Sequence, residues 1–209
     1  MSQLQVLVDS IIAGRKAEVE GHVAQALAAG ISPQAILDDG LIAPMAEVGA
    51  RFERGEFYVP EMLIAARAMQ AGLAVLKPHL AQGGVVMRGT VVIGTVKGDL
   101  HDIGKNLVAM MLEGAGFEIV DLGTDVGPEK FAAAVREHHP TLVGMSALLT
   151  TTMKSMHACI EAIEDLGLRG QVKILVGGAP VTEAFATSIG ADGYAPDASR
   201  AVALAKSFG

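Results

Sequence analysis

The stretch GDLHDIGKN, residues 98–106, places an aspartate and a histidine two positions apart, directly after an apolar run. Across a tight loop, the carboxylate of Asp99 can accept the Nδ1 proton of His101, which leaves Nε2 as an outward lone pair. That imidazole can serve as a metal ligand or as a general base. A base would need a nucleophile, and the sequence has neither a Gly-x-Ser-x-Gly elbow nor a Cys/His pairing.

A metal ion at His101 would need further ligands, and the sequence offers few of them. Cys159 is the only cysteine, which excludes a Cys-rich zinc site. His138 and His139 end a predicted helix on what should be the far side, and His157 lies inside another helix. One imidazole without co-ligands predicts a metal that arrives already held by a cofactor. Phosphate cradling is a weaker alternative, because the glycines fit neither the dinucleotide nor the P-loop spacing.

The elements that position this loop begin near residue 88, where short, mostly β-branched runs alternate with helical stretches. Such alternation predicts an α/β fold: a doubly wound, parallel, five-stranded, flavodoxin-like (Rossmann-like) domain that binds ligands at the carboxyl ends of its strands. The expected strands are Thr90–Val96, Phe117–Gly123, Thr141–Ala147, Val172–Gly178 and, more weakly, Gly193–Pro196. The expected helices are Ile103–Gly114, Pro128–His138, Thr151–Leu166, Pro180–Ser188 and Ala198–Ser207.

The first part of the chain is helical by its apolar spacing. Four stripes with the three-and-four period and short connections predict a four-helix bundle. Pro44 falls inside the third helix and should bend or break it. Gly83–Gly89 is a linker and a predicted hinge between domains of residues 1–87 and 88–209. The stripes are Leu4, Leu7, Val8, Ile11; Val19, Val23, Ala26, Leu27; Leu37, Leu41, Met45, Val48, Phe52; and Met62, Ala66, Met69, Leu73, Leu76.

Composition narrows the partners. The 209 residues carry a net charge of -7 without a Lys/Arg cluster, which argues against nucleic acid and anionic membranes as partners. The single cysteine is typical of a reducing compartment, so we expect a cytoplasmic protein. The apolar stretches are expected to end short of the roughly 20 residues of a spanning helix, and Gln3, Gln5 and Asp9 do not fit a signal peptide.

Three motifs in one order resemble those of cobalamin-binding domains. DLHDIG resembles the family's Asp-x-His-x-x-Gly, and MSALLTTT and VGGAP resemble its Ser-x-Leu and Gly-Gly partners. The helical module with FERGEFYVPEM resembles the cap of cobalamin-dependent methionine synthase and of the small corrinoid proteins of methanogens and acetogens. The resemblance covers essentially the whole chain, which makes it far more specific than one motif.

The resemblance implies a bound corrinoid, such as cobalamin or methylcobalamin, whose benzimidazole is displaced while His101 becomes the lower ligand of cobalt. Asp99 would hold His101, and Thr152 would hydrogen-bond Asp99, so that a proton can be exchanged as cobalt cycles between Co(I) and methyl-Co(III). The nucleotide tail would thread past small residues, while Phe52 and Val59 cover the methyl face, although Val59 is smaller than the leucine usual in methionine synthase. The residues expected at the corrinoid are Gly94, Gly98, Asp99, Leu100, His101, Asp102, Ile103, Gly104, Ser146, Leu148, Thr150, Gly177, Gly178, Ala198, Phe52 and Val59.

Simpler roles remain open for several of these residues. Ser146 and Thr150 could end a strand and cap a helix, and Phe52 and Val59 could be core residues. Lys105 and its neighbour at position 106 are expected to face solvent on the first turn of a helix.

The implied function is that of a methyl carrier rather than a complete enzyme, because 209 residues leave no room for a substrate barrel or a folate site. One substrate-specific methyltransferase would load cobalt, a second would pass the methyl group to tetrahydrofolate or a thiol, and a reductive activase would be a further partner. The methyl donor stays open among methanol, methylamines, methoxylated aromatics and quaternary amines.

Three alternatives share parts of the pattern. The small subunit of an adenosylcobalamin mutase usually lacks the helical cap, and a cobalamin-based sensor would need a DNA-binding or signalling module. A receiver-like phosphoacceptor domain would need clustered aspartates after the first strand and a lysine after the fifth, and the sequence has neither.

Overall fold

The computed structural model describes residues 3–83 and 87–208, with the side chains of residues 81–83 left aside. The chain divides into two compact units. One comprises Met1–Met87 with Glu113–Gly116, and the other comprises Arg88–Leu112 with Phe117–Gly209. The predicted hinge at Gly83–Gly89 falls partly on residues 84–86, which lie outside the described residues.

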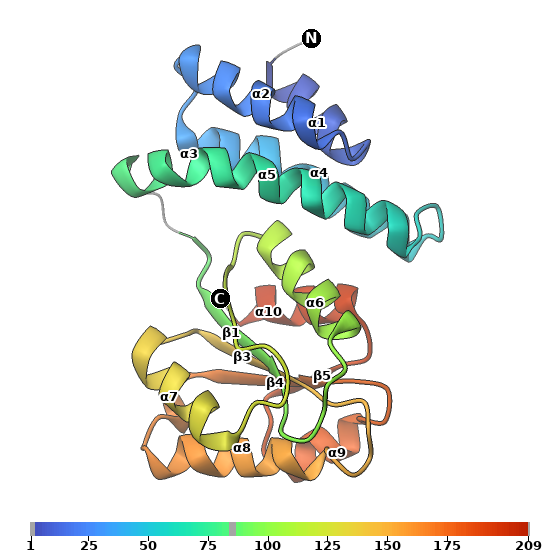
Figure 1. Cartoon of the computed structure of the whole chain (residues 1–209), viewed down its shortest axis with the longest axis vertical. Coiled ribbons are helices and arrows are strands. Elements are labelled where there is room, and N and C mark those ends of the chain that lie inside the picture. The colour runs from blue at the N-terminus through green and yellow to red at the C-terminus, as the bar shows by residue number, and fades with distance from the viewer. Residues whose placement is uncertain (1–2, 84–86, 209) are drawn as a thin grey trace. The chain divides into compact units, whose positions relative to one another are not determined.

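The N-terminal unit is helical, as predicted (Figure 1). Residues of its apolar stripes form the core. Leu7, Val23, Leu41 and Met69 are each at most 1% exposed, because the three-and-four spacing puts them on one face of their helices. The helices are α1 (Gln3–Ile12), α2 (Lys16–Ala28), α3 (Pro33–Ala35), the π-helical η1 (Ile36–Ile42), α4 (Ala43–Glu53) and α5 (Val59–Gly83).

Pro44 lies in the third predicted helix, which is expected to bend or break there. The backbone stays helical from Pro33 to Glu53 through α3, η1 and α4, so the helix does not break, but its hydrogen-bond pattern changes before Pro44. Directly before it, η1 takes π-helical geometry, and the N–H of Ala43 donates to the carbonyl of Asp38, five residues back. Proline has no N–H and its ring crowds the carbonyl four residues back, so the regular pattern cannot run through this position.

Helix α5 corrects one expectation from the sequence. Its segment Val59–Leu80 is long and apolar enough to cross a membrane by length and composition alone, so not every apolar stretch is short. Of its most apolar window of 18 residues, 44% is buried inside the structure, and Met62 and Met69 are each 1% exposed. Such burial is typical of the core helix of a bundle.

The C-terminal unit contains one parallel sheet with strand order β2-β1-β3-β4-β5. This is the doubly wound, flavodoxin-like order, which confirms the predicted fold. Helices α6 and α10 lie on one side of the sheet and α7, α8 and α9 on the other (Figure 1). The strands are β1 (Thr90–Thr95), β2 (Glu118–Asp121), β3 (Leu142–Ser146), β4 (Lys173–Gly177) and β5 (Gly193–Ala195). The helices are α6 (Ile103–Gly114), α7 (Pro128–His138), α8 (Lys154–Asp165), the 3-10 turn η2 (Arg169–Gln171), α9 (Glu183–Ser188) and α10 (Ala198–Ser207).

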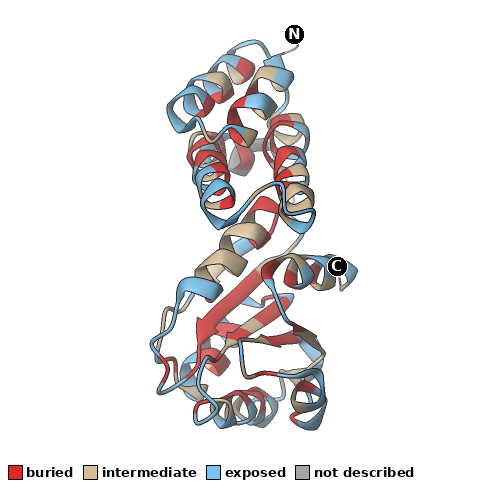
Figure 2. Ribbon diagram, turned by 90° about the vertical axis from the view of Figure 1, so that its right-hand side faces the viewer, coloured by how far each residue is buried: buried red, intermediate tan, exposed pale blue. Residues whose placement is uncertain are grey.

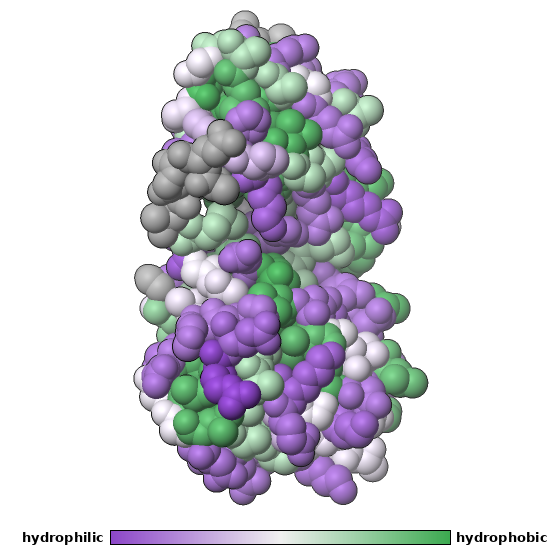
Figure 3. Space-filling model, turned by 60° about the vertical axis from the view of Figure 1, so that its left-hand side comes forward, coloured by the Kyte–Doolittle hydropathy of each residue, from purple (hydrophilic) through white to green (hydrophobic). Residues whose placement is uncertain are grey.

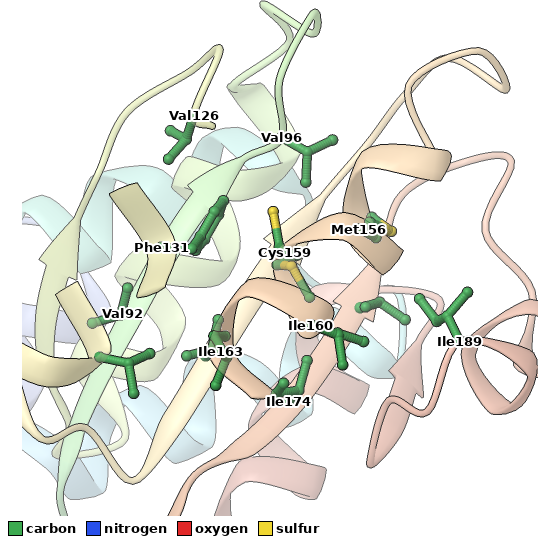
Figure 4. Packing of buried hydrophobic residues seen from close by; sticks show 14 of the residues in the cluster. Val92, Val96, Val126, Phe131, Met156, Cys159, Ile160, Ile163, Ile174 and Ile189 are labelled. Atoms are coloured by element: carbon green, nitrogen blue, oxygen red, sulfur yellow. The ribbon is translucent and has the colours of Figure 1, made fainter. Parts of the chain in front are cut away.

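The larger core of this unit lies between the sheet and α7, α8 and α9. Phe131 of α7 and Ile163 of α8 pack on Val92 and Ile174 of the strands (Figure 4). Figure 2 shows the strands mostly as buried, as expected for a parallel sheet with helices on both faces. On the face in Figure 3, hydrophobic and hydrophilic side chains alternate in small groups over both units.

Candidate cofactor site

The polypeptide makes a tight turn where β1 ends. The N–H of Asp99 donates to the carbonyl of Val96 at 3.1 Å, and Gly98 has φ +85°. A four-residue turn with positive φ at its third position favours glycine there, which accounts for Gly98. Two residues after Asp99, the carbonyl of His101 accepts a hydrogen bond from the Thr95 hydroxyl at 2.8 Å. The loop is thus tied back to the strand that it leaves.

The Asp99 carboxylate fixes the tautomer of His101. Asp99 is fully buried, and its Oδ1 lies 2.7 Å from His101 Nδ1 and accepts the His101 N–H at 3.1 Å. An ionised carboxylate can only accept, so Nδ1 carries the proton and Nε2 keeps a lone pair. The His101 side chain is 52% exposed, which makes it accessible to a ligand from outside.

The second carboxylate oxygen of Asp99 is held by the loop after β3. Its Oδ2 accepts the N–H groups of Leu148 at 2.8 Å and Leu149 at 3.2 Å, and the Thr152 hydroxyl at 2.8 Å. Burial by itself would raise the pKa of Asp99, but the hydrogen bonds from Leu148, His101 and Thr152 outweigh burial and hold the pKa far below its usual range. The carboxylate is therefore ionised, as its contact with Nδ1 requires.

Replacing Thr152 with Val should lower the free energy of unfolding of the corrinoid-free chain by about 1–2 kcal/mol. The side chain is 6% exposed, and Val leaves Asp99 with one donor fewer in a buried place. Thr152→Ser keeps the hydroxyl and should cost about 0.5 kcal/mol or less. Urea unfolding of both variants measures the difference, and equal losses would show that the hydroxyl contributes no more to stability than the methyl group that Ser lacks.

The two loops at Asp99 and His101 also carry four apolar side chains that are exposed at the surface. Leu100 is 73% exposed and Ile103 82%, and Leu148 and Leu149 are 43% and 42% exposed. Across residues 3–83 and 87–208, no group of three or more His, Cys, Asp or Glu side chains could hold a metal ion. A metal at Nε2 must bring its other ligands with it, and an apolar rim fits the broad face of a macrocycle. The residues present therefore fit a corrinoid.

Small side chains form a row across the carboxyl end of the sheet. Thr95, Ser146, Gly177 and Ala195 are register neighbours on β1, β3, β4 and β5. By the alternation of side chains along strands, the row faces α6 and α10, opposite the Phe131 core. No large side chain therefore stands in this row, which crosses the switch point between β1 and β3.

One polar atom at the same edge has no partner. Ser199, in the first turn of α10, has a buried Oγ without a hydrogen-bond partner among the residues that the structure describes. Buried hydroxyls are nearly always bonded, so a polar group of a bound molecule is a natural partner for this atom.

Local packing accounts for two of the glycines that the resemblance implies at the corrinoid and its nucleotide tail, Gly94 and Gly178. Gly94 points away from the row of small residues, and a Cβ there would lie 2.8 Å from Phe131 of α7, so glycine serves the packing of that helix. Because side chains alternate, Gly94 does not share a face with Ser146 and Gly177, and the structure does not support it as a tail contact. At Gly178, a Cβ would lie 1.8 Å from the carbonyl oxygen of Ala147, so close backbone packing requires glycine.

The other predicted residues are spread over the two units. Asp102 and Gly104, which follow His101 in the loop after β1, are exposed, and so is Thr150 in the loop after β3. Ala198, 5% exposed, is the first residue of α10. In the N-terminal unit, Phe52 of α4 is half-buried, while Val59, at the start of α5, is 39% exposed. The roles of all these residues at a corrinoid stay predictions.

Lys105 contradicts the expectation that it faces solvent. It is 3% exposed, and its Nζ forms an ion pair with Asp121 at the end of β2 and a hydrogen bond with Asn106. A buried ammonium needs such partners, and they tie the first turn of α6 to the sheet. The signal in the sequence was Asp121, an acidic residue inside the second predicted strand, Phe117–Gly123.

Comparisons with known proteins agree with this geometry. Residues 89–203 match a family model described as B12 binding domain, and residues 3–77 match a second model with the same description. The chain is 46% identical over 204 residues to the dimethylamine corrinoid protein of Methanosarcina barkeri, covering 97% of this chain and 95% of that one. It is 46% identical over 185 residues to trimethylamine corrinoid protein 1 of Methanosarcina mazei, covering 88% and 86%.

Two solved structures share the fold over nearly the whole chain. A cobalamin-binding protein from Desulfitobacterium hafniense has a TM-score of 0.79 and 31% identity, with full coverage of both chains. The methanol:cobalamin methyltransferase complex MtaBC from Methanosarcina barkeri contains a chain with a TM-score of 0.84 and 30% identity, covering 98% of this chain and 78% of that one. The chain therefore belongs to the family of B12-binding corrinoid methyl carriers that includes the dimethylamine and trimethylamine corrinoid proteins, as its sequence predicts, and its cofactor is a corrinoid.

Proposed function

We propose that this chain carries a methyl group between two methyltransferases on a corrinoid whose lower cobalt ligand is Nε2 of His101. The observation that carries the proposal is the buried Asp99, which holds Nδ1 at 2.7 Å and leaves Nε2 of a 52% exposed imidazole free. When bound, the corrinoid supplies a cobalt centre that accepts and releases the methyl group.

The chain's own residues hold the imidazole and manage its proton. Thr152 and the Leu148 N–H keep the Asp99 carboxylate ionised beside His101. The same carboxylate holds the ring proton on Nδ1 and leaves Nε2 as the ligand atom. Asp99, His101 and Thr152 thus fix which ring nitrogen can face a metal.

The remaining parts of the proposal follow from the two units. Residues 1–87 are the cap, with Phe52 and Val59 at the upper face, and residues 88–209 bind the cofactor. Small residues beside the switch point receive the nucleotide tail: Ser146, Gly177 and Ala198, as predicted, and in addition Thr95, Ala195 and Ser199. The setting is the cytoplasm.

The partners and the methyl donor follow from the relatives. The curated relatives with 46% identity are named as dimethylamine and trimethylamine corrinoid proteins, which supports a methylated amine as donor. The MtaBC complex supports a substrate-specific methyltransferase as partner. An acceptor methyltransferase acting on tetrahydrofolate or a thiol, and a reductive activase, complete the set.

Loss of the imidazole in His101→Ala should change the visible spectrum of the chain reconstituted with hydroxocobalamin. The wild type should show a histidine-ligated cobalt, whereas His101→Ala should show a cobalt without imidazole. His157→Ala is the matched control, because His157 is 51% exposed on α8 and should leave the spectrum unchanged. Identical spectra for wild type and His101→Ala would remove His101 from the cobalt.

The donor is tested separately. The reduced, corrinoid-loaded chain is incubated with a dimethylamine-specific or a methanol-specific methyltransferase and its substrate. Methyl transfer to the corrinoid with the amine system and not with methanol supports the proposal. Transfer only from methanol would assign the chain to a different donor.

A further inference from the structure

Asp125, in the loop between β2 and α7, contacts the turn that carries Asp99. Its Oδ1 accepts the N–H of Gly98 at 2.8 Å, and its own N–H donates to the carbonyl of Asp99 at 2.9 Å. These two groups lie on either side of the Asp99 Cα. One residue therefore fixes the backbone on both sides of the atom from which the Asp99 side chain projects.

The backbone of Asp125 is in a conformation that non-glycine residues seldom adopt. Its φ is +53°, in the left-handed region, which carries a cost for every residue with a Cβ. This conformation aims its N–H and its carboxylate at the same turn. The strain is thus accompanied by two hydrogen bonds, a combination often found near functional sites.

The negative charge of Asp125 is paired with the positive charge of Lys97. Its Oδ2 lies 3.2 Å from Nζ of Lys97, and both side chains are largely exposed, at 43% and 60%. The hydrogen bond from Gly98 and the ion pair with Lys97 hold the pKa of Asp125 below its usual value. An exposed ion pair contributes little by itself, so the hydrogen bond to Gly98 is the contact that matters.

The loop of His101 is thus held from two sides of the switch point. The loop after β3 holds the Asp99 side chain through Leu148 and Thr152, and the loop after β2 holds the Asp99 backbone through Asp125. A rotation of the Asp99 backbone would move Oδ1 away from Nδ1 and turn the imidazole. The direction of Nε2 therefore depends on both loops.

We propose that Asp125 is a positioning residue that sets how strongly His101 coordinates the corrinoid cobalt. It acts through its hydrogen bonds to Gly98 and Asp99. This inference rests on the proposed role of His101 as the lower ligand. It adds a residue from the loop after β2, which carries none of the three motifs.

The test uses the full-length chain with ¹⁵N-labelled histidine, loaded with cob(II)alamin. Electron paramagnetic resonance of Co(II) shows a doublet splitting only if a protein histidine is the axial ligand, because benzimidazole of natural nitrogen gives a triplet. Spectroelectrochemistry of the same samples, with soluble mediators, gives the Co(II)/Co(I) midpoint potential. Since Co(I) prefers no lower ligand, stronger histidine coordination makes that potential more negative.

Asp125→Ala should lower the ratio of histidine-bound to histidine-free Co(II) about tenfold, the size of one hydrogen bond to a charged acceptor. If nearly all Co(II) is histidine-bound in the wild type, the tenfold lower ratio raises the midpoint potential by about 59 mV, the value of a tenfold change for one electron. If only part of the Co(II) is histidine-bound, the lower ratio shows as a loss of the doublet. Asp125→Asn keeps an oxygen that accepts from Gly98 and should restore wild-type values.

Two further variants separate the hydrogen bond to Gly98 from the ion pair and from the backbone strain. Lys97→Met removes the ion pair but keeps the bond to Gly98, and it should behave as wild type. Asp125→Gly removes the carboxylate without the cost of a positive φ, so it folds even if Asp125→Ala does not, and it should show the same weakened coordination. Wild-type doublets and potentials in both Asp125→Ala and Asp125→Gly would overturn the inference. A wild-type chain without the ¹⁵N doublet would instead overturn the proposed function, and the inference with it.

Discussion

Asp99→Asn should lower the free energy of unfolding of the corrinoid-free chain by about 2–4 kcal/mol. The two carboxylate oxygens of Asp99 receive five donors. Two come from His101, and the other three come from the N–H groups of Leu148 and Leu149 and the hydroxyl of Thr152. An amide offers one oxygen and one NH₂, so its NH₂ group must face donors whichever way the side chain is turned.

Urea unfolding measures this loss, with Asp102→Asn as the matched control. Asp102 lies in the same loop but is exposed and accepts only one side-chain hydrogen bond that the structure shows, from Asn106 at 3.0 Å. Its replacement should change the free energy of unfolding by about 0.5 kcal/mol or less. If both variants lose the same amount, the convergence of donors on Asp99 does not stabilise the fold.

The pH dependence gives a second check on the same variant. The pKa of Asp99 is lowered in the folded chain, so its ionisation stabilises the wild type above the unfolded-state pKa of about 3.9. That contribution is lost as pH falls from this value through the folded-state pKa. The difference in unfolding free energy between wild type and Asp99→Asn should therefore be constant above about pH 5 and shrink below about pH 4.

The bounds of helices were predictable from the sequence where residues at the helix ends mark them. The predicted ranges Ile103–Gly114, Pro128–His138 and Ala198–Ser207 coincide with α6, α7 and α10, because Pro at a first turn and Asp197 as N-cap mark two of these starts. Helix α8 begins at Lys154, three residues later than predicted. The cause is Thr152, whose hydroxyl points to Asp99, so the site takes residues that the period alone assigns to the helix.

The candidate site was predictable in part. The hydrogen bonds of Asp99 with His101 and Thr152 are present as the resemblance implies. Lys105 and Asp125 were missed because their partners lie 16 and 27 residues away. Such contacts depend on strand order and on one left-handed residue, which the pattern of a single sequence does not specify.

The face of β1 on which Gly94 lies follows from the sequence alone. Gly94 alternates with Val92 and Val96, which are both in the core beneath α7 and α8. The period of two places Gly94 on their face and Thr95 on the other. The alternation alone therefore favours Thr95 over Gly94 for the proposed contact with a nucleotide tail.

Gly178→Ala should destabilise the C-terminal unit by about 4 kcal/mol or more. Gly178 has φ +126°, and an added Cβ would lie 1.8 Å from the carbonyl oxygen of Ala147, so the backbone of one loop must move. Ala147 directly precedes Leu148 and Leu149, whose N–H groups hold Asp99. Under the proposed ligation by His101, the same change should also weaken the spectrum of histidine-bound cobalt in the corrinoid-loaded chain.

Two control variants in the same unit distinguish the cost of a positive φ from the cost of the clash between the added Cβ and Ala147. Gly190 has φ +75° and open space around a Cβ, whereas Gly170 has open space and no φ in the left-handed range. Gly190→Ala should cost about 1–2 kcal/mol from strain alone, and Gly170→Ala about 0.5 kcal/mol or less. Urea unfolding should rank Gly178, Gly190 and Gly170 in that order. A loss at Gly178 no larger than at Gly190 would mean that the loop after β3 moves freely, and its N–H groups could then not hold the Asp99 carboxylate in a fixed position beside His101.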